Sequence, residues 1–442
     1  MDIQKLLLNA LGMQPEEVII EKYLTNLDQL STSITLRQRR ERCHCIKCNG
    51  QLYGVKQWVK KKLYGIPLGV FLKVEIIFYQ LQGICGGDCN NKTRVARACF
   101  IHPHLRRMTT AFAELAGRWM EETTCAAVER MTGCSSMSLW RLDQWRMKKM
   151  KDNFKLPNDL PISLASADEV HMMTLRPQEQ RSEKSLWEKK FITNLVSYNL
   201  SKVIINAKGR SGRSLQSCLK QLGPELCKQI NFLAVDMHDG FIEAAEKYCP
   251  NAKVAVDRFH VAEALNKAFD EVRKQEFEQA KQNKDNFQRQ ILMPSKRFIL
   301  VERSRDLSKE NQSHLEKLRK LNQNINSAML LVEYFHKILD KKKVEEFRKG
   351  LKLWEDLVVE AGLTSFIDFL KTVKKYKERI EVYIKSHLTT AVSEGINNKI
   401  KVLKRVGYTY TNEMSFQNKI LQRCGLLNSK NINTNKWFWH VT

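Results

Sequence analysis

Two short apolar runs that each end on an aspartate decide the fold of this chain: Phe232-Leu-Ala-Val-Asp236 and Lys253-Val-Ala-Val-Asp257. Between them, Met237-His-Asp-Gly240 leads into an amphipathic segment, and Arg258-Phe-His260 then opens a long helical stretch. The pattern predicts strand, helix, strand and helix, with carboxylates at the strand ends, where α/β folds present polar groups to a cleft. Aspartate is also an ordinary turn or helix-cap residue, so neither residue alone indicates a site.

The segments upstream extend this pattern into a mixed sheet. Ile162-Ser-Leu-Ala-Ser-Ala-Asp168 is predicted as a strand that reaches a carboxylate. Further strands are expected at Phe191–Tyr198 and Val203–Ala207, and a helix at about Ser214–Leu222. The resulting order, β-β-β-α-β-α-β-α, is typical of the ribonuclease-H-like fold, in which the first and fourth strands lie side by side. We therefore expect Asp168 and Asp236 to be neighbours although they are distant in sequence.

Composition limits the class of protein. The chain has 442 residues, which predicts more than one domain, and its 43% apolar fraction is enough for real cores. It carries 74 basic against 48 acidic residues, a net charge of +26, which favours a polyanionic partner, nucleic acid before a membrane surface. No apolar run reaches the ~18–20 residues of a membrane span and the N-terminus does not resemble a signal peptide, so we expect a soluble cytoplasmic protein.

Cysteine spacing predicts a structural Zn²⁺ site. In a cytoplasmic protein the 12 cysteines are expected to be free thiols or metal ligands rather than disulfides. Cys45-x2-Cys48 is followed by Asn-Gly, and Cys85-x3-Cys89 follows a strand-rich interval at Val70–Gln80. Two such pairs are typical of a four-cysteine zinc ribbon, although unpaired thiols are the alternative. The longer second spacing leaves three further candidate ligands: Cys43, His44 and Cys99.

Helical patterns follow Pro103. They predict helices at Met108–Glu122 and Thr123–Met131, a turn at Gly133-Cys134, and a basic helix at Ser135–Met150. A short helix, a glycine turn and a basic second helix suit a helix-turn-helix, although a solvated αα-hairpin has the same pattern. The candidate DNA contacts on the second helix are Ser135, Ser136, Ser138, Arg141 and Arg146.

A later helix supplies a third acid. In Ser393–Arg405, apolar residues at 396, 400 and 403 form a buried stripe, and Glu394 lies on another face. Two divalent ions that clamp a phosphoryl transfer need several carboxylates, so Glu394 is predicted to join Asp168 and Asp236. A solvated helix with a capping glutamate is the alternative. The candidate DNA contacts on this helix are Asn398, Lys401, Lys404 and Arg405.

These patterns predict five regions along a multidomain α/β chain: a zinc-ribbon region at 1–103, a helix-turn-helix at 104–156, the first part of a ribonuclease-H-like core at 157–275, an all-helical insertion at 276–385, and the C-terminal part of the core, carrying Glu394, at 386–442.

The chain resembles the bacterial insertion-sequence DDE transposases of the ISL-three family. The matching residues are Asp236-Met-His-Asp-Gly, Val256-Asp-Arg-Phe-His-Val261, Leu265-Asn, Asp270-Glu-Val-Arg273 and Ser393-Glu-Gly-Ile-Asn-Asn-Lys-Ile-Lys401. The resemblance implies Asp168, Asp236 and Glu394 as a catalytic triad that binds Mg²⁺ or Mn²⁺, with Asp257 and His260 in supporting roles. The first-acid region, Ser166–His171, matches loosely, and Glu169 stands beside Asp168 as an alternative acid.

The family also implies partners and a reaction. The expected partner is double-stranded DNA, namely the terminal inverted repeats and target DNA, bound by a homodimer or larger assembly at the bacterial nucleoid. The expected reaction is metal-dependent cleavage at the element's ends followed by strand transfer. Two other functions share these features: a site-specific nuclease on the same fold, and an inactive DNA-binding regulator derived from a transposase.

Overall fold

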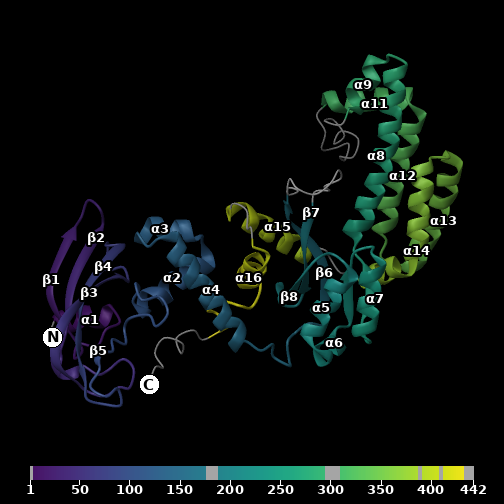
Figure 1. The fold of residues 1–442 in the computed structure, drawn as a ribbon. Coiled ribbons are helices and arrows are strands. Elements are labelled where there is room, and N and C mark those ends of the chain that lie inside the picture. Colours follow the sequence, from purple (N-terminus) through teal and green to yellow (C-terminus); the bar gives the residue numbers. More distant parts are fainter. Residues whose placement is uncertain (1–2, 176–187, 294–308, 387–390, 408–411, 433–442) are drawn as a thin grey trace, which may run out of the picture. The chain divides into compact units, whose positions relative to one another are not determined.

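The computed structural model describes residues 3–175, 188–293, 309–386, 391–407 and 412–432 (Figure 1). It divides the chain into two compact units. The first consists of Met1–Lys155, Arg405–Tyr408 and Met414–Thr442, and the second of Leu156–Lys404 and Thr409–Glu413. None of the described helices is long and apolar enough to cross a membrane.

A five-stranded sheet opens the first unit. Its order is β1-β2-β4-β3, with β5 paired to β4. Residues alternate between buried and half-exposed along β2 and most of β4, as expected for a sheet with one face on a core. Helix α1 lies beside the core that contains Ile34, Ile76 and Phe78. The elements are α1 (Ile3–Ala10), β1 (Val18–Asn26), β2 (Ser31–Gln38), η1 (Arg40–Arg42), β3 (Leu52–Gly65), β4 (Lys73–Cys85) and β5 (Thr93–Val95).

Three helices follow the sheet: α2 (Thr110–Glu122), α3 (Cys125–Thr132) and α4 (Ser136–Asn153). Each begins one or two residues later than its sequence pattern suggested, because Thr109, Thr124 and Ser135 cap the helices with their side-chain oxygens. Gly133 ends α3 with φ +73°, the left-handed conformation that glycine adopts without steric cost.

The C-terminal segment packs on these helices. Helix α16 (Glu413–Arg423) buries Phe416 and Ile420, and Leu427 and Ile432 join Met147 and Met150 of α4 in one apolar cluster. The sequence analysis assigned all of 386–442 to the catalytic core. The structure differs: from Met414 onward this segment belongs to the first unit, because its apolar side chains have their partners there.

The second unit contains a mixed sheet with the order β10-β9-β6-β7-β8. Strands β6, β7 and β8 are antiparallel neighbours, whereas β9 pairs parallel with β6 and β10 parallel with β9. The predicted adjacency of the first and fourth strands is therefore confirmed. The elements are β6 (Leu164–Leu175), β7 (Glu188–Ser197), β8 (Lys202–Lys208), α5 (Gly212–Leu222), α6 (Pro224–Gln229), β9 (Phe232–Val235), α7 (Asp239–Tyr248) and β10 (Lys253–Val256).

Helices form the rest of the described second unit. Helix α8 runs without a break across the predicted boundary at residue 275, and one hydrophobic core extends from Val256 to Ile384. Trp354 lies in that core and donates from Nε1 to the carbonyl of Leu331 at 2.8 Å. The helices are α8 (Arg258–Gln282), α9 (Asn286–Leu292), α11 (Lys309–Leu321), α12 (Gln323–Leu339), α13 (Val344–Ala361), α14 (Thr364–Ser386) and α15 (Ala391–Val406).

Candidate active site and metal centre

Three aspartates come directly after paired residues on three neighbouring strands of the second sheet. Val235, the last residue of β9, pairs with Ala167 on β6 and with Val256 on β10. Asp236 and Asp257 are the first residues after β9 and β10, and Asp168, which lies within β6, is the next residue after Ala167. Because β6 and β10 each pair in parallel with β9, this register brings the three aspartates together at the end of the parallel pairing.

The aspartates differ in their hydrogen bonds. The Asp168 carboxylate accepts from the Glu169 N–H, and the Asp236 carboxylate from the Met237 N–H, each at 2.6 Å. Asp257 is buried and accepts from the Phe259 N–H at 2.8 Å, so it caps α8. Burial raises the pKa of Asp257 even though this hydrogen bond favours the ionised form. Asp257 therefore has a structural role as a helix cap, which the sequence analysis gave as the alternative to a site role.

His260 lies between two of the carboxylates. Its Nδ1 is 3.2 Å from Asp236 Oδ1, and its Nε2 is 3.7 Å from Asp168 Oδ1. Burial opposes the charged imidazolium, but the interaction with Asp168 and the charges of Asp236, Asp168 and Asp257 outweigh it and raise the pKa of His260 to about 9. A protonated His260 therefore balances the negative charge of this edge.

Glu169 is a fourth acid near the same edge. Burial, followed by the charges of Asp236 and Asp168, raises the pKa of its carboxyl to about 7. A carboxyl with this pKa is partly protonated near neutral pH. Glu169 is thus less suited than Asp168 to hold a cation by charge, because a protonated carboxyl does not attract one.

Helix α15 packs against β6 through polar side chains. The hydroxyls of Ser393 and Ser166 are 2.8 Å apart, and the Tyr198 hydroxyl is 2.9 Å from that of Ser393. One turn further along α15, the amide of Asn397 donates to the Asp168 carboxylate. At the other end of the helix, the Lys404 ammonium donates to the His171 carbonyl at 3.1 Å. These contacts bring α15 to the acidic edge although more than 200 residues separate it from β6.

Glu394 lies in the first turn of this helix and is exposed. It is adjacent to Ser393 and one turn before Asn397, two of the residues that contact β6. Within the described ranges, however, no group of three His, Cys, Asp or Glu residues at this edge has its ligand atoms within 4.8 Å of one another. The structure thus places the helix of Glu394 at the site without placing the three acids around one point.

The chemistry of the donors fits hard divalent cations. Asp168 and Asp236 offer carboxylate oxygens, the ligands that Mg²⁺ and Mn²⁺ prefer. Both side chains are half-buried, with 19% and 25% of their surface exposed, so a cation and a phosphate can reach them. The excess negative charge is at present offset by His260.

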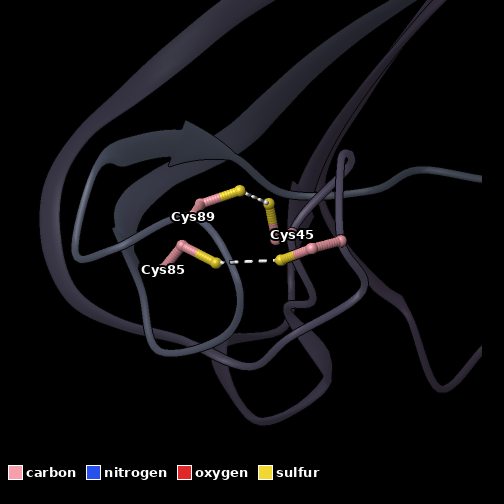
Figure 2. Close-up of side chains that lie close together, drawn as sticks. Cys45, Cys85 and Cys89 are labelled. Atoms are coloured by element: carbon pink, nitrogen blue, oxygen red, sulfur yellow. Dashed lines mark hydrogen bonds between the residues drawn. The ribbon is translucent and has the colours of Figure 1, made fainter.

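Four cysteines form a separate cluster in the first unit. The Sγ atoms of Cys45, Cys48, Cys85 and Cys89 all lie within 4.8 Å of one another. Cys45 Sγ is 3.9 Å from Cys89 Sγ (Figure 2). Cys48 Sγ is 3.2 Å from Cys85 Sγ, so each contact joins one cysteine of the first sequence pair to one of the second. Four thiolates in one small volume suit a tetrahedral Zn²⁺ with no open position.

The backbone around the cysteines supports this assignment. The N–H groups of Lys47 and Gly87 point at Cys45 Sγ and Cys85 Sγ, each at 3.4 Å. The two cysteine turns pack closely at glycines, since a Cβ on Gly50 would lie 2.7 Å from Gly87 Cα. A hydrogen bond from the Gly50 backbone, helped by Cys85, lowers the pKa of Cys48 to about 6, which favours the thiolate that zinc binds.

The alternative ligands stand apart from this cluster. Cys43 donates its thiol to the Arg39 carbonyl at 3.0 Å, and burial raises its pKa to about 11. His44 interacts through Nδ1 with the Arg42 carbonyl, and Cys99 is exposed. The four predicted ligands are therefore the four cysteines that cluster in the structure. The turn that contains Cys85 and Cys89 brings both thiols to the cluster despite its x3 spacing.

The candidate DNA contacts on α4 fall into two groups. Arg141 is exposed, whereas the Ser135 and Ser136 hydroxyls are used locally, the first as the cap of α4 and the second as a donor to Glu129. Arg146 needs correction. It is fully buried, with Nη1 2.7 Å from Glu114 and Nη2 2.8 Å from Glu121, and Gly117 leaves room for its guanidinium. Arg146 is a buried structural residue and cannot reach DNA phosphates.

The sequence analysis overlooked the polar face that attaches α15. Ser393 and Asn397 are spaced i, i+4, and this spacing placed them on one face of the helix. Their partners Ser166, Tyr198 and Asp168 are distant in sequence, so the sequence alone did not indicate these contacts. On the same helix Asn398, Lys401 and Arg405 are exposed, while Lys404 is half-buried.

Comparison with known proteins defines the class of this chain as a transposase. A family model described as a transposase, that of the ISL3 (ISL-three) DDE type, matches residues 182–420, more than half of the sequence. The chain therefore belongs to the ISL3 transposase family. It is 23% identical over 389 residues to the transposase for insertion sequence element IS1001 of Bordetella parapertussis, covering 88% of this chain and 90% of that one. It is also 20% identical over 239 residues to the transposase for insertion sequence element IS1557 in two strains of Mycobacterium tuberculosis, covering 50% of this chain and 54% of those.

Proposed function

We propose that this protein is an active DDE transposase that binds the ends of an insertion sequence and catalyses metal-dependent DNA cleavage and strand transfer. One observation carries the proposal: Asp168 and Asp236 follow directly on the paired residues Ala167 and Val235, at an edge that α15 also reaches. Family membership supports the same reaction. The strand order is the one expected for a ribonuclease-H-like core.

Asp168, Asp236 and Glu394 are the residues that would hold the divalent ions. Mg²⁺ or Mn²⁺ bound there would activate the attacking oxygen and stabilise the leaving oxygen of phosphoryl transfer. The protein fixes the first two carboxylates through adjacent backbone N–H groups and positions α15 through Ser393 and Asn397. His260 holds the positive charge that these carboxylates require without a cation, and Asp257 fixes the start of α8.

DNA recognition belongs to the first unit in this proposal. Helices α3 and α4 with the turn at Gly133 form the helix-turn-helix, and Arg141 is the exposed cation near the start of α4. The four-cysteine module holds Zn²⁺ as a structural ion.

On α15, Asn398, Lys401 and Arg405 contact DNA phosphates, whereas Lys404 also attaches the helix to His171. Two or more copies act together on paired DNA ends, in the bacterial cytoplasm at the nucleoid.

The decisive experiment supplies the full-length protein with Mg²⁺, a plasmid carrying both ends of the element, and target DNA. A transposase yields DNA in which an element end is joined to the target. A site-specific nuclease yields cleaved ends without joined products, and an inactive regulator binds the ends and leaves them intact. Either of the last two results would overturn the proposal.

A further inference from the structure

Two large apolar side chains on α4 face solvent. Met137 is 60% exposed and Trp140 is 45% exposed. Of the other large apolar residues of this helix, Leu139, Leu142, Met147 and Met150 are completely buried, and Trp145 is half-buried against the core of the three helices. The helix therefore already has a full apolar face toward its own unit, and Met137 and Trp140 are not part of it.

Their position on the helix is specific. Met137 and Trp140 are spaced i, i+3, so their side chains are neighbours on the surface of α4, and exposed Arg141 lies i+4 from Met137. All three lie in the first two turns, the part of a recognition helix whose side chains reach base edges in the major groove. The serines nearby are less available, because Ser135 caps the helix and Ser136 donates to Glu129.

We propose that Met137 and Trp140 form an apolar contact with thymine methyl groups in the major groove of the recognised DNA end. This inference rests on the proposed function and adds to it the residues and base chemistry that select the sequence. The thymine 5-methyl group is the one apolar feature among the major-groove edges of the four bases, and apolar side chains recognise it. Arg141 beside them supplies the polar contact, for which guanine offers the matching pair of acceptors.

A second copy of the chain is the other partner that an exposed apolar pair suits. The surroundings favour DNA, because four exposed residues that continue along α4 are basic, Arg141, Lys148, Lys149 and Lys151, against one exposed acid, Asp152, at the end of the helix. Arg141, Lys148 and Lys151 recur at i+4, i+11 and i+14 from Met137, so they lie on the same side of the helix as the apolar pair. Cations in this arrangement match a phosphate backbone beside a base edge.

The test removes the methyl group without removing the base pair. Full-length protein first enriches a duplex from a random-sequence library, and each dT of that duplex is then replaced by dU. We expect binding to weaken roughly three- to fourfold for each contacted methyl group. The Met137→Ala/Trp140→Ala variant should bind the original duplex about as weakly as the wild type binds the duplex that contains dU. Its affinity should not fall further when dU replaces dT. Leu27→Ala, which truncates a side chain 69% exposed on the β1–β2 turn, should remain as sensitive to dU as wild type.

The outcomes separate this inference from the function on which it rests. If the wild type enriches a sequence that Arg141→Ala binds poorly, yet dU has no effect, the thymine contact is wrong and sequence recognition stands. If the wild type enriches no sequence, the proposal that the first unit recognises a DNA sequence is wrong, and the proposed thymine contact is wrong as well. If the double variant changes the oligomeric state of the free protein but keeps its dU sensitivity, the pair is a protein contact. Thermal unfolding of each variant checks that the exposed substitutions leave the fold intact.

Discussion

The hydroxyl oxygens of Ser166 and Ser393 lie 2.8 Å apart and are both buried, although 227 residues separate them. Ser166 is two residues before Asp168 on β6, and Ser393 is next to Glu394 on α15. This pair, with the Tyr198 hydroxyl, connects the strand of the first proposed catalytic acid to the helix of the third. Helix α15 is thus attached to the sheet by buried polar groups that form hydrogen bonds with one another.

Removing one of these hydroxyls should impair catalysis more than DNA binding. Ser393→Ala leaves the buried hydroxyl of Ser166 and the hydroxyl of half-buried Tyr198 without this partner, which costs about 1–3 kcal/mol of folding free energy. We expect slower cleavage with nearly unchanged end binding, measured by single-turnover cleavage and by gel shift. Ser217→Ala on the exposed surface of α5 is the matched control and should behave as wild type.

A double-mutant cycle distinguishes the contact from a general effect on folding. If Ser166→Ala and Ser393→Ala act through the same bond, the double variant should lose less free energy than the two single variants together. Fully additive losses, in either stability or cleavage rate, would show that the two serines act independently.

Zinc should be stoichiometric and should depend on the four clustered thiolates. Cys48→Ser removes one ligand, so the N-terminal module should lose its metal and end binding, while the second unit stays folded. Cys43→Ser is a close control, because Cys43 is buried near the cluster but its thiol donates to Arg39. Elemental analysis of protein purified without chelator provides the readout. Wild-type protein without zinc, or loss of zinc from Cys43→Ser, contradicts the assignment.

Sequence patterns predicted those parts of the site that local order determines. Strand order brought Asp168 beside Asp236, and the paired cysteines form the predicted cluster because each pair lies within one turn of chain. Helical spacing placed Glu394, Asn398 and Lys401 on the exposed side of α15. In each case the information lies within a few residues or in the order of neighbouring strands.

Contacts between distant elements were not predictable in the same way. Arg146 stands in a basic run, and its burial depends on Glu114, Glu121 and the space at Gly117, all on another helix. Sequence order assigned the C-terminal segment to the catalytic core, because it does not reveal the partner of that segment's apolar residues. That partner is α4, where Leu427 and Ile432 pack on Met147 and Met150. Periodicity identifies which face is buried, whereas the identity of the partner depends on the whole fold.

Acid should destabilise the first unit through His102. This side chain is buried, and its Nδ1 accepts hydrogen bonds from the N–H groups of His104 and Leu105 at 3.2 and 2.9 Å. Burial, helped by the charge of His104, lowers the pKa of His102 to about 4, from an ordinary value near 6.5. Between these pH values the unfolded chain binds a proton that the folded chain does not. Stability is therefore lost as pH falls through this window, by at most about 3 kcal/mol.

The comparison of wild type with His102→Asn isolates this effect, because asparagine keeps an acceptor and does not titrate. Urea unfolding can be followed by tryptophan fluorescence, to which Trp145 contributes; its ring centroid lies 4.6 Å from that of His102. We expect the stability difference between the two proteins to shift in favour of the variant from pH 7 to pH 4. Zinc release at low pH affects both proteins alike and cancels. A constant difference across this range would falsify the neutral, buried state of His102.

Glu394 provides the strictest test of the proposed active site. Glu394→Gln keeps the size and polarity of the side chain but removes the charge that would bind a divalent ion. The residue is exposed and has no ion pair within the described part of the chain, so thermal stability and end binding should stay near wild type. Cleavage and joining with Mg²⁺ should fall below detection, because two carboxylates remain where several are needed.

Glu243→Gln is the control for this substitution, since Glu243 is an exposed glutamate on α7 within the same unit. It should cleave and join DNA as wild type does. If Glu394 were only a solvated residue near the start of α15, its glutamine variant would also be fully active. Full activity would remove Glu394 from the site and direct attention to Glu169, whose carboxyl is already close to Asp168 and Asp236 and whose raised pKa would fall on binding a cation.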